Sequence, residues 1–119
     1  MLICNWKMFG NKALVDAYKE VLPASKDIIV CPPFPLLASL SRKFVTGAQN
    51  CHHEKEGAFT GEVSASLLAE IGCRYVLLGH SERRQYAAET NDLVIQKSNT
   101  AVDCGLTPIV CVGSQDEDI

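Results

Sequence analysis

Two short polar segments carry the side chains best suited to chemistry. Residues 5–7 read Asn-Trp-Lys, and residues 79–84 read Gly-His-Ser-Glu-Arg-Arg; each segment follows a short apolar run. A histidine can transfer protons near neutral pH, and a lysine ammonium can stabilise negative charge that develops beside it. These two segments are therefore the first candidates for a functional site.

Each of these residues also has an ordinary structural interpretation. A histidine at a strand end is often only a hydrogen-bonded polar residue, and Lys7 can be a surface lysine. Glu82 and Arg83 can form a solvated pair worth about 0–1 kcal/mol. Asn5 can be a turn residue that ends a strand. Residue types and spacing alone leave this choice open.

The elements that would position these residues alternate along the chain. Short runs rich in Ile and Val alternate with segments of helical period, which predicts an α/β fold with a parallel sheet. The runs are continuously apolar, as in parallel strands buried on both faces. The five predicted strands are residues 2–5, 27–31, 44–50, 75–79 and 107–112.

Four helices are predicted between the strands. Apolar residues recur at helical spacing over residues 14–22, and Pro23 ends that helix. Residues 35–44 form the second, although their Leu and Ser residues fit more than one period. Thr90 and Gly105 bracket the last helix, residues 91–104.

The third helix follows residue 64. Ser64 is its predicted N-cap, and Gly72 is placed for the left-handed turn at its end. Its predicted inner face holds Leu67, Leu68 and Ile71. In a parallel sheet the loops after the strands carry functional groups, so residues 5–7 and 79–84 should lie at the same edge.

Five blocks of sequence, in order, resemble motifs of the triosephosphate isomerase family. They cover essentially the whole chain and are Asn-Trp-Lys-Met at 5–8, Ala-Gln-Asn at 48–50, Gly-Ala-Phe-Thr-Gly-Glu at 57–62, Gly-His-Ser-Glu-Arg-Arg at 79–84 and Pro-Ile-Val-Cys-Val-Gly at 108–113. The resemblance implies a parallel (β/α)₈ barrel, a fold of eight units and about 250 residues. Residues 1–119 would be its amino-terminal half, with five strands and four helices.

The resemblance also implies a reaction and its residues. The family interconverts dihydroxyacetone phosphate and glyceraldehyde 3-phosphate through an enediolate, in glycolysis and gluconeogenesis, without a cofactor or metal. His80 matches the family's catalytic histidine, which a helix N-terminus keeps neutral; here residues 81–86 can begin that helical turn. Lys7 matches the catalytic, substrate-binding lysine, Asn5 would bind substrate, and Glu82 matches a second carboxylate of the site, which we do not take as the base.

Residues 51–62 form a long connection with two glycines, which favours a functional loop. By the resemblance, Thr60, Gly61 and Glu62, together with Gln49, would contact a second subunit, so a homodimer is expected. The alternative is a mobile surface loop.

The sequence departs from the family pattern in three places. Ser114 stands where the family usually has Glu, and the connection at residues 39–43 is short. The family's glutamate base, lid and late phosphate-binding loops would all follow the fifth strand. We therefore expect a chain that is incomplete and inactive alone. The alternative is a half-barrel that acts only as a binding or dimerising module.

Composition limits the other function classes. The net charge is −3, and the eleven Lys and Arg are scattered, which argues against nucleic acid or an anionic membrane as partner. Neither a leader sequence nor a membrane span is recognised, so a soluble cytoplasmic protein with a small-molecule partner is expected. A nucleotide-binding module would need a glycine-rich turn after the first strand, and residues 6–10 do not supply one.

The cysteines are predicted to be buried, reduced thiols. Several replace an aliphatic residue inside an apolar run, and none forms a zinc-type Cys-x-x-Cys pair. Adjacent residues on a loop rarely converge on one ion, so Cys-His-His at 51–53 is interpreted as solvated loop and not as a metal site. The six cysteines are at positions 4, 31, 51, 73, 104 and 111.

Overall fold

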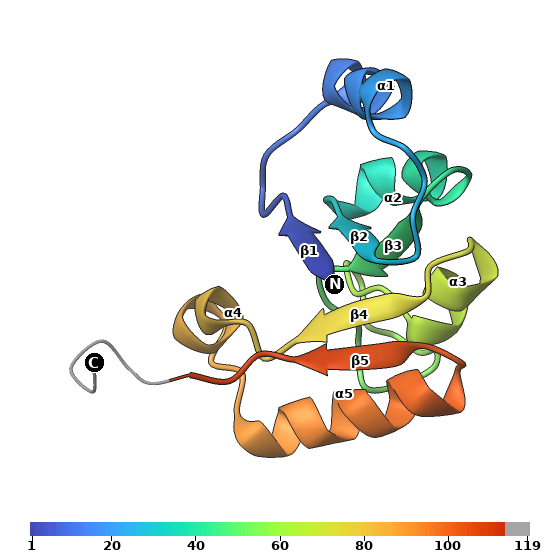
Figure 1. Cartoon of the computed structure of the whole chain (residues 1–119). Coiled ribbons are helices and arrows are strands. Elements are labelled where there is room, and N and C mark those ends of the chain that lie inside the picture. Colours follow the sequence, from blue (N-terminus) through green and yellow to red (C-terminus); the bar gives the residue numbers. More distant parts are fainter. Residues whose placement is uncertain (114–119) are drawn as a thin grey trace.

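The computed structural model describes residues 1–113 as a curled sheet of five parallel strands with helices packed against it (Figure 1). The strands lie in sequence order, so each β-helix-β unit places its second strand beside its first. Their bounds are β1 Leu2–Asn5, β2 Ile28–Cys31, β3 Val45–Ala48, β4 Tyr75–Leu78 and β5 Thr107–Val110. All five predicted strands are confirmed, most of them shorter by a residue or more.

The structure describes five helices where the sequence predicted four. The additional one is α4, which the sequence indicated only as a helical turn after His80. The bounds are α1 Lys12–Val21, α2 Phe34–Ser41, α3 Ala65–Glu70, α4 Ser81–Tyr86 and α5 Asn91–Asp103. The fold is that of the first half of a (β/α)₈ barrel.

The two faces of the sheet pack differently because side chains alternate along each strand. On one face Val30 packs with residues of α1 and α2, and Val76 and Leu78 pack with residues of α2, α3 and α5. On the other face Ile29, Cys31 and Leu77 pack among strand residues alone. The helices therefore cover one face, and the sheet curls around the other.

Burial separates the inner strands from the edge strands. In β2, β3 and β4 the last three residues are fully buried, as the continuous apolar runs predict. No residue of β1 or β5 is fully buried. Within residues 1–113 neither edge strand has a partner on its outer side, so the prediction of burial on both faces is wrong for these two strands.

Local signals account for several helix ends. The Ser64 hydroxyl accepts a hydrogen bond from Leu67 N, and the Thr90 hydroxyl accepts one from Leu93 N, as predicted for N-caps. Gly72 is left-handed, with φ 98°. The predicted inner face of α3 is only partly right: Leu68 is buried, whereas Leu67 is 52% exposed.

All six cysteines are free. Cys31, Cys51 and Cys73 are buried, as predicted, but the remaining three are only half-buried. Among the described residues no helix is both long and apolar enough to cross a bilayer.

Candidate active site

A hollow of about 580 Å³ lies at the carboxyl ends of β1, β3 and β4. Both segments singled out in the sequence contribute to its wall. The predicted residues that line it are Asn5, Lys7, Gln49, His80 and Glu82. Met8, Phe9, Tyr86 and their neighbours complete the wall with apolar surface.

Lys7 is held in an unusual backbone conformation. Its φ is 55°, a left-handed value that costs a residue with a side chain about 1–3 kcal/mol. Asn5 Oδ1 accepts a hydrogen bond from Lys7 N at 2.9 Å, and Gln49 Nε2 donates to Lys7 O at 2.8 Å. Both peptide groups of the lysine are therefore fixed, one by Asn5 of the preceding strand and one by Gln49, directly after β3.

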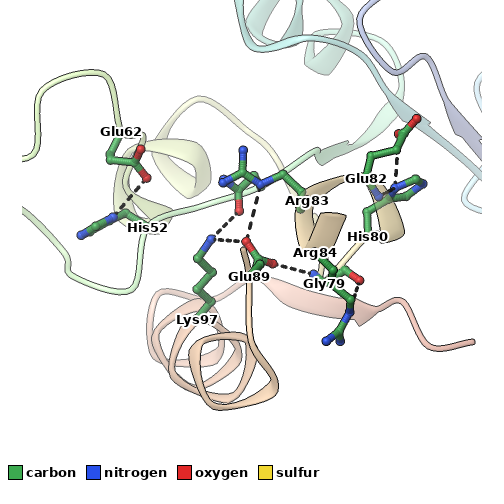
Figure 2. A network of polar contacts seen from close by, with 10 residues as sticks. His52, Glu62, Gly79, His80, Glu82, Arg83, Arg84, Glu89 and Lys97 are labelled. Carbon is green, nitrogen blue, oxygen red and sulfur yellow. Dashed lines mark hydrogen bonds and ion pairs between the residues drawn. The ribbon is translucent and has the colours of Figure 1, made fainter. Parts of the chain in front are cut away.

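The Glu82 carboxylate lies between the lysine and the histidine. Its Oε2 lies 3.3 Å from Lys7 Nζ, and its Oε1 lies 3.2 Å from His80 Nδ1 (Figure 2 shows the second contact). The Lys7 and Glu82 side chains are about half exposed, and such pairs contribute about 1 kcal/mol or less to stability. The effect of the cluster is to place an ammonium, a carboxylate and an imidazole side by side.

His80 is the N-cap of α4. Its Nδ1 accepts a hydrogen bond from Glu82 N at 3.1 Å. Because this amide always carries its proton, we assign the accepting role to Nδ1, and the neutral ring then bears its proton on Nε2. A ring capped in this way can offer an N–H donor to a ligand while its other nitrogen orders the helix start.

Behind the hollow lies a buried ionic network that the sequence reasoning missed (Figure 2). Glu89 Oε1 accepts from Gly79 N at 2.9 Å, and Oε2 accepts from Lys97 Nζ at 2.7 Å and lies 3.5 Å from Arg83 Nε. The Glu89 and Lys97 side chains are only 1% and 3% exposed. Lys97 Nζ also donates to Asn50 Oδ1 at 2.9 Å, so the network joins the segments after β3 and β4.

The surroundings of Glu89 keep its carboxyl group ionised. Burial by itself would raise the pKa of Glu89, but the hydrogen bond and charge of Lys97, the Gly79 N–H and the charge of Arg83 together lower it below its usual range. A lysine on the buried side of a helix, at the spacing of Val94 and Ala101, was the available sequence signal for this network.

Gly79 links the network to His80 at a position where a side chain would be strained. Its φ is 67°, and an added Cβ would lie 2.7 Å from Arg84 Nη2 and 3.0 Å from Val94 Cγ2. Arg84 Nε donates to Gly79 O at 2.7 Å, and Nη1 donates to Asn91 Oδ1 at 2.7 Å. The two peptide groups that flank Gly79 are thus fixed, one by Glu89 at its N–H and one by Arg84 at its carbonyl.

Of the residues predicted for a subunit contact, Gln49 lies in the hollow and the other three lie in a loop outside it. Gln49 lines the hollow, and its amide also donates to Cys31 O at 2.9 Å. Thr60 and Gly61 are exposed in the loop between β3 and α3, and neither lines the hollow. Glu62 Oε1 lies 3.2 Å from His52 Nδ1 in the same loop.

The cysteine and histidines after β3 do not form a metal site. Within residues 1–113 no three His, Cys, Asp or Glu side chains converge in a way that could hold an ion. Burial raises the pKa of Cys51 to about 11, although the charge of Lys97 opposes the rise. Ser114, the predicted departure from the family pattern, lies outside the described residues.

Comparison with known proteins matches residues 1–118 to the triosephosphate isomerase family. A triosephosphate isomerase of Herpetosiphon aurantiacus is 48% identical over 124 residues, covering 95% of this chain and 50% of that protein. The enzyme of Carboxydothermus hydrogenoformans is 47% identical, with 96% and 50% covered. That of the Wolbachia of Brugia malayi is 44% identical, with 99% and 53% covered. The chain spans about half the length of these curated relatives.

Proposed function

Because the chain belongs to the triosephosphate isomerase family, we propose that its hollow forms part of an isomerase active site. The proposed reaction interconverts dihydroxyacetone phosphate and glyceraldehyde 3-phosphate by moving a proton between adjacent carbons through an enediolate. The observation that carries the proposal is the convergence of Lys7, Glu82 and His80, from the ends of two non-adjacent strands, in one hollow.

Each residue has a role that its surroundings support. His80, with its proton on Nε2, donates a hydrogen bond to the substrate oxygen on which negative charge develops. The Lys7 ammonium stabilises the same charge and that of the phosphate. Asn5 binds substrate beside it. Glu82 holds Lys7 with its carboxylate and His80 with its backbone N–H. By the resemblance, proton abstraction belongs to a glutamate in the half of the relatives that this chain does not cover.

The experiment that tests these roles is a kinetic comparison in the protein completed by that second half. His80→Gln or Lys7→Ala should lower turnover by about 10²- to 10⁴-fold with little change in fold. Lys26→Ala is the matched control, because Lys26 is an exposed lysine that does not line the hollow. Near-full activity after either change would overturn the site assignment.

The second candidate is a half-barrel that binds or dimerises without isomerase activity. The unpartnered outer sides of β1 and β5 within residues 1–113 favour it, because an open strand edge can pair with another chain. For the 119-residue polypeptide alone we expect no useful isomerisation. By the resemblance, the glutamate base and the closing lid both follow the fifth strand, and the proton transfer and exclusion of water that they provide contribute separately to the rate. Clear activity in both directions from a monomer of 13.0 kDa, measured by assay and light scattering, would contradict this expectation.

The proposed assembly is a homodimer in which Thr60, Gly61 and Glu62 contact the partner. Gln49 contributes to the same interface by holding the Lys7 carbonyl in place. The exposure of Phe59 at the same loop supports a contact there. Thr60→Arg should lower the mass measured by light scattering, and Glu70→Arg, on an exposed residue of α3, should not. Equal masses for both variants would exclude this loop as the contact. Six free thiols support a reducing compartment, and we propose the cytoplasm.

A further inference from the structure

Two contacts of His52 join the start of the loop between β3 and α3 to its end. His52 N donates to Val63 O at 2.8 Å. The His52 ring also places Nδ1 3.2 Å from Glu62 Oε1 (Figure 2). Backbone and side chain of the same histidine thus tie the start of the loop to its end.

The His52 ring is also the centre of an aromatic stack. Its centroid lies 4.3 Å from that of His53 and 4.2 Å from that of Phe59. Gly57 permits this approach, since a Cβ there would lie 2.5 Å from the Phe59 ring. Two turns fold the tip back toward the stack: Phe59 N donates to Gly57 O, and Glu62 N donates to Phe59 O, each at 2.9 Å.

The two ring nitrogens of His52 have unequal surroundings. Nδ1 faces the Glu62 carboxylate, whereas Nε2 is buried and has no hydrogen-bond partner within residues 1–113. A proton on Nε2 would be a buried donor without an acceptor, which is unfavourable. A proton on Nδ1 forms a charge-assisted hydrogen bond with the carboxylate instead.

We propose that His52, as the Nδ1–H tautomer, is a clasp that holds the 51–62 loop in one preformed shape. Neither the isomerase chemistry nor a metal site requires this role. Its consequence is that the exposed segment from Lys55 to Gly61 is presented with little conformational freedom, so a partner that binds the loop has little ordering to impose.

The neighbouring histidine supplies the control. The His53 side chain is 30% exposed against 13% for His52, and its nearest acidic atom is 3.9 Å away on Glu54. The His53 ring takes part in the stack, 6.5 Å from that of Phe59, but within residues 1–113 its side chain makes no hydrogen bond across the loop. Replacing either histidine by Phe keeps an aromatic ring and removes both ring nitrogens, so the two variants share the change in ring size and differ in the contact that is lost.

Limited proteolysis measures how often the loop opens, because cleavage follows the population of open forms when reclosing is fast. In the purified protein we expect trypsin to cleave after the exposed Lys55 about fivefold faster in His52→Phe than in the parent. His53→Phe should change the rate by less than about twofold. Equal rates in His52→Phe and the parent, or equal acceleration by both variants, would overturn the clasp.

A second measurement needs no variant and is independent of activity and oligomeric state. Nitrogen-15 NMR of the imidazole side chains at pH 8, where free histidine is neutral, distinguishes the two tautomers. We expect the His52 proton on Nδ1 and the His80 proton on Nε2. A His52 proton on Nε2 would refute the proposal even if the isomerase assignment holds, and a failed kinetic test at His80 would leave the clasp standing.

Discussion

The inner strands β2 to β4 and the edge strands β1 and β5 differ far more in burial than in sequence. Ile29 of β2 and Ile3 of β1 are paired neighbours in the sheet, yet Ile29 is fully buried and Ile3 is 38% exposed. An apolar run therefore predicts that a segment is a strand, but its burial is decided by neighbours elsewhere in the chain or beyond it.

The polar chemistry follows the same division. The segments after β3 and β4 are joined by the buried Glu89–Lys97 pair. Lys7, after the edge strand β1, makes its ion pair with Glu82 in half-exposed surroundings. If burial decides energy, the buried pair should contribute more to stability than the exposed one.

The largest effect should come from breaking the buried pair. Lys97→Met leaves the Glu89 carboxylate without its closest cation, and the loss of one partner of a buried pair costs roughly 3–5 kcal/mol. Lys7→Met, the exposed counterpart, should cost about 1 kcal/mol or less. Urea unfolding of the two variants measures both changes, and similar costs would show that burial does not separate these pairs.

The next effect should come from the paired isoleucines. Ile29→Ala removes fully buried methyl groups and should lower the free energy of unfolding by about 2–5 kcal/mol. Ile3→Ala, at the exposed edge, should lower it by about 1 kcal/mol. If the protein in which the chain occurs shows equal losses, then another segment or subunit covers β1 there.

A smaller effect is expected from acid. Since the pKa of Glu89 is lowered in the folded state, its stabilising contribution is present above the ordinary glutamate value of about 4.3 and is lost as the pH falls through the folded pKa. Each unit of lowering corresponds to about 1.4 kcal/mol. The free energy of unfolding should fall more steeply below about pH 5 in the parent than in Glu89→Gln, and parallel curves would contradict this assignment.

The smallest change in stability should accompany alkylation of the edge cysteine. Burial, aided by the neighbouring thiol of Cys73, raises the pKa of Cys31 to about 12, so Cys31 of β2 should resist iodoacetamide at pH 8. The half-buried Cys4 of β1 should react in the folded protein without unfolding it. Mass mapping of the labelled sites provides the measurement, with the denatured protein as control, and rapid labelling of Cys31 would show that β2 opens readily.

Sequence reasoning worked where the signal was local. Strand positions follow from runs of Ile and Val, and the caps at Ser64 and Thr90 follow from side chains that bond to their own helices. It was incomplete at α4, whose six residues include no buried position and so lack the apolar period by which helices are recognised. It was wrong at Leu67 because α3 has too few turns to define a face.

The functional site shows the same contrast between local and long-range signals. Lys7, His80 and Glu82 were recognisable because they occur in short motifs directly after strands. Glu89 and Lys97 were not, since their partners Gly79, Asn50 and Arg83 come from separate segments that only the folded sheet brings together. The left-handed backbone of Lys7 was also beyond reach, because the hydrogen bond from Gln49 that fixes it spans 42 positions of sequence.

Gly79 matters to the site because glycine has no Cβ. Every single-nucleotide change that replaces this glycine adds a Cβ in the space occupied by the Arg84 guanidinium and Val94. In a library of all single substitutions, replacements at position 79 should therefore be depleted relative to replacements at the exposed neighbour Ser81. For a lineage that carries this chain, the left-handed backbone and the close neighbours of residue 79 should therefore slow its substitution, whatever the chemistry of the incoming side chain.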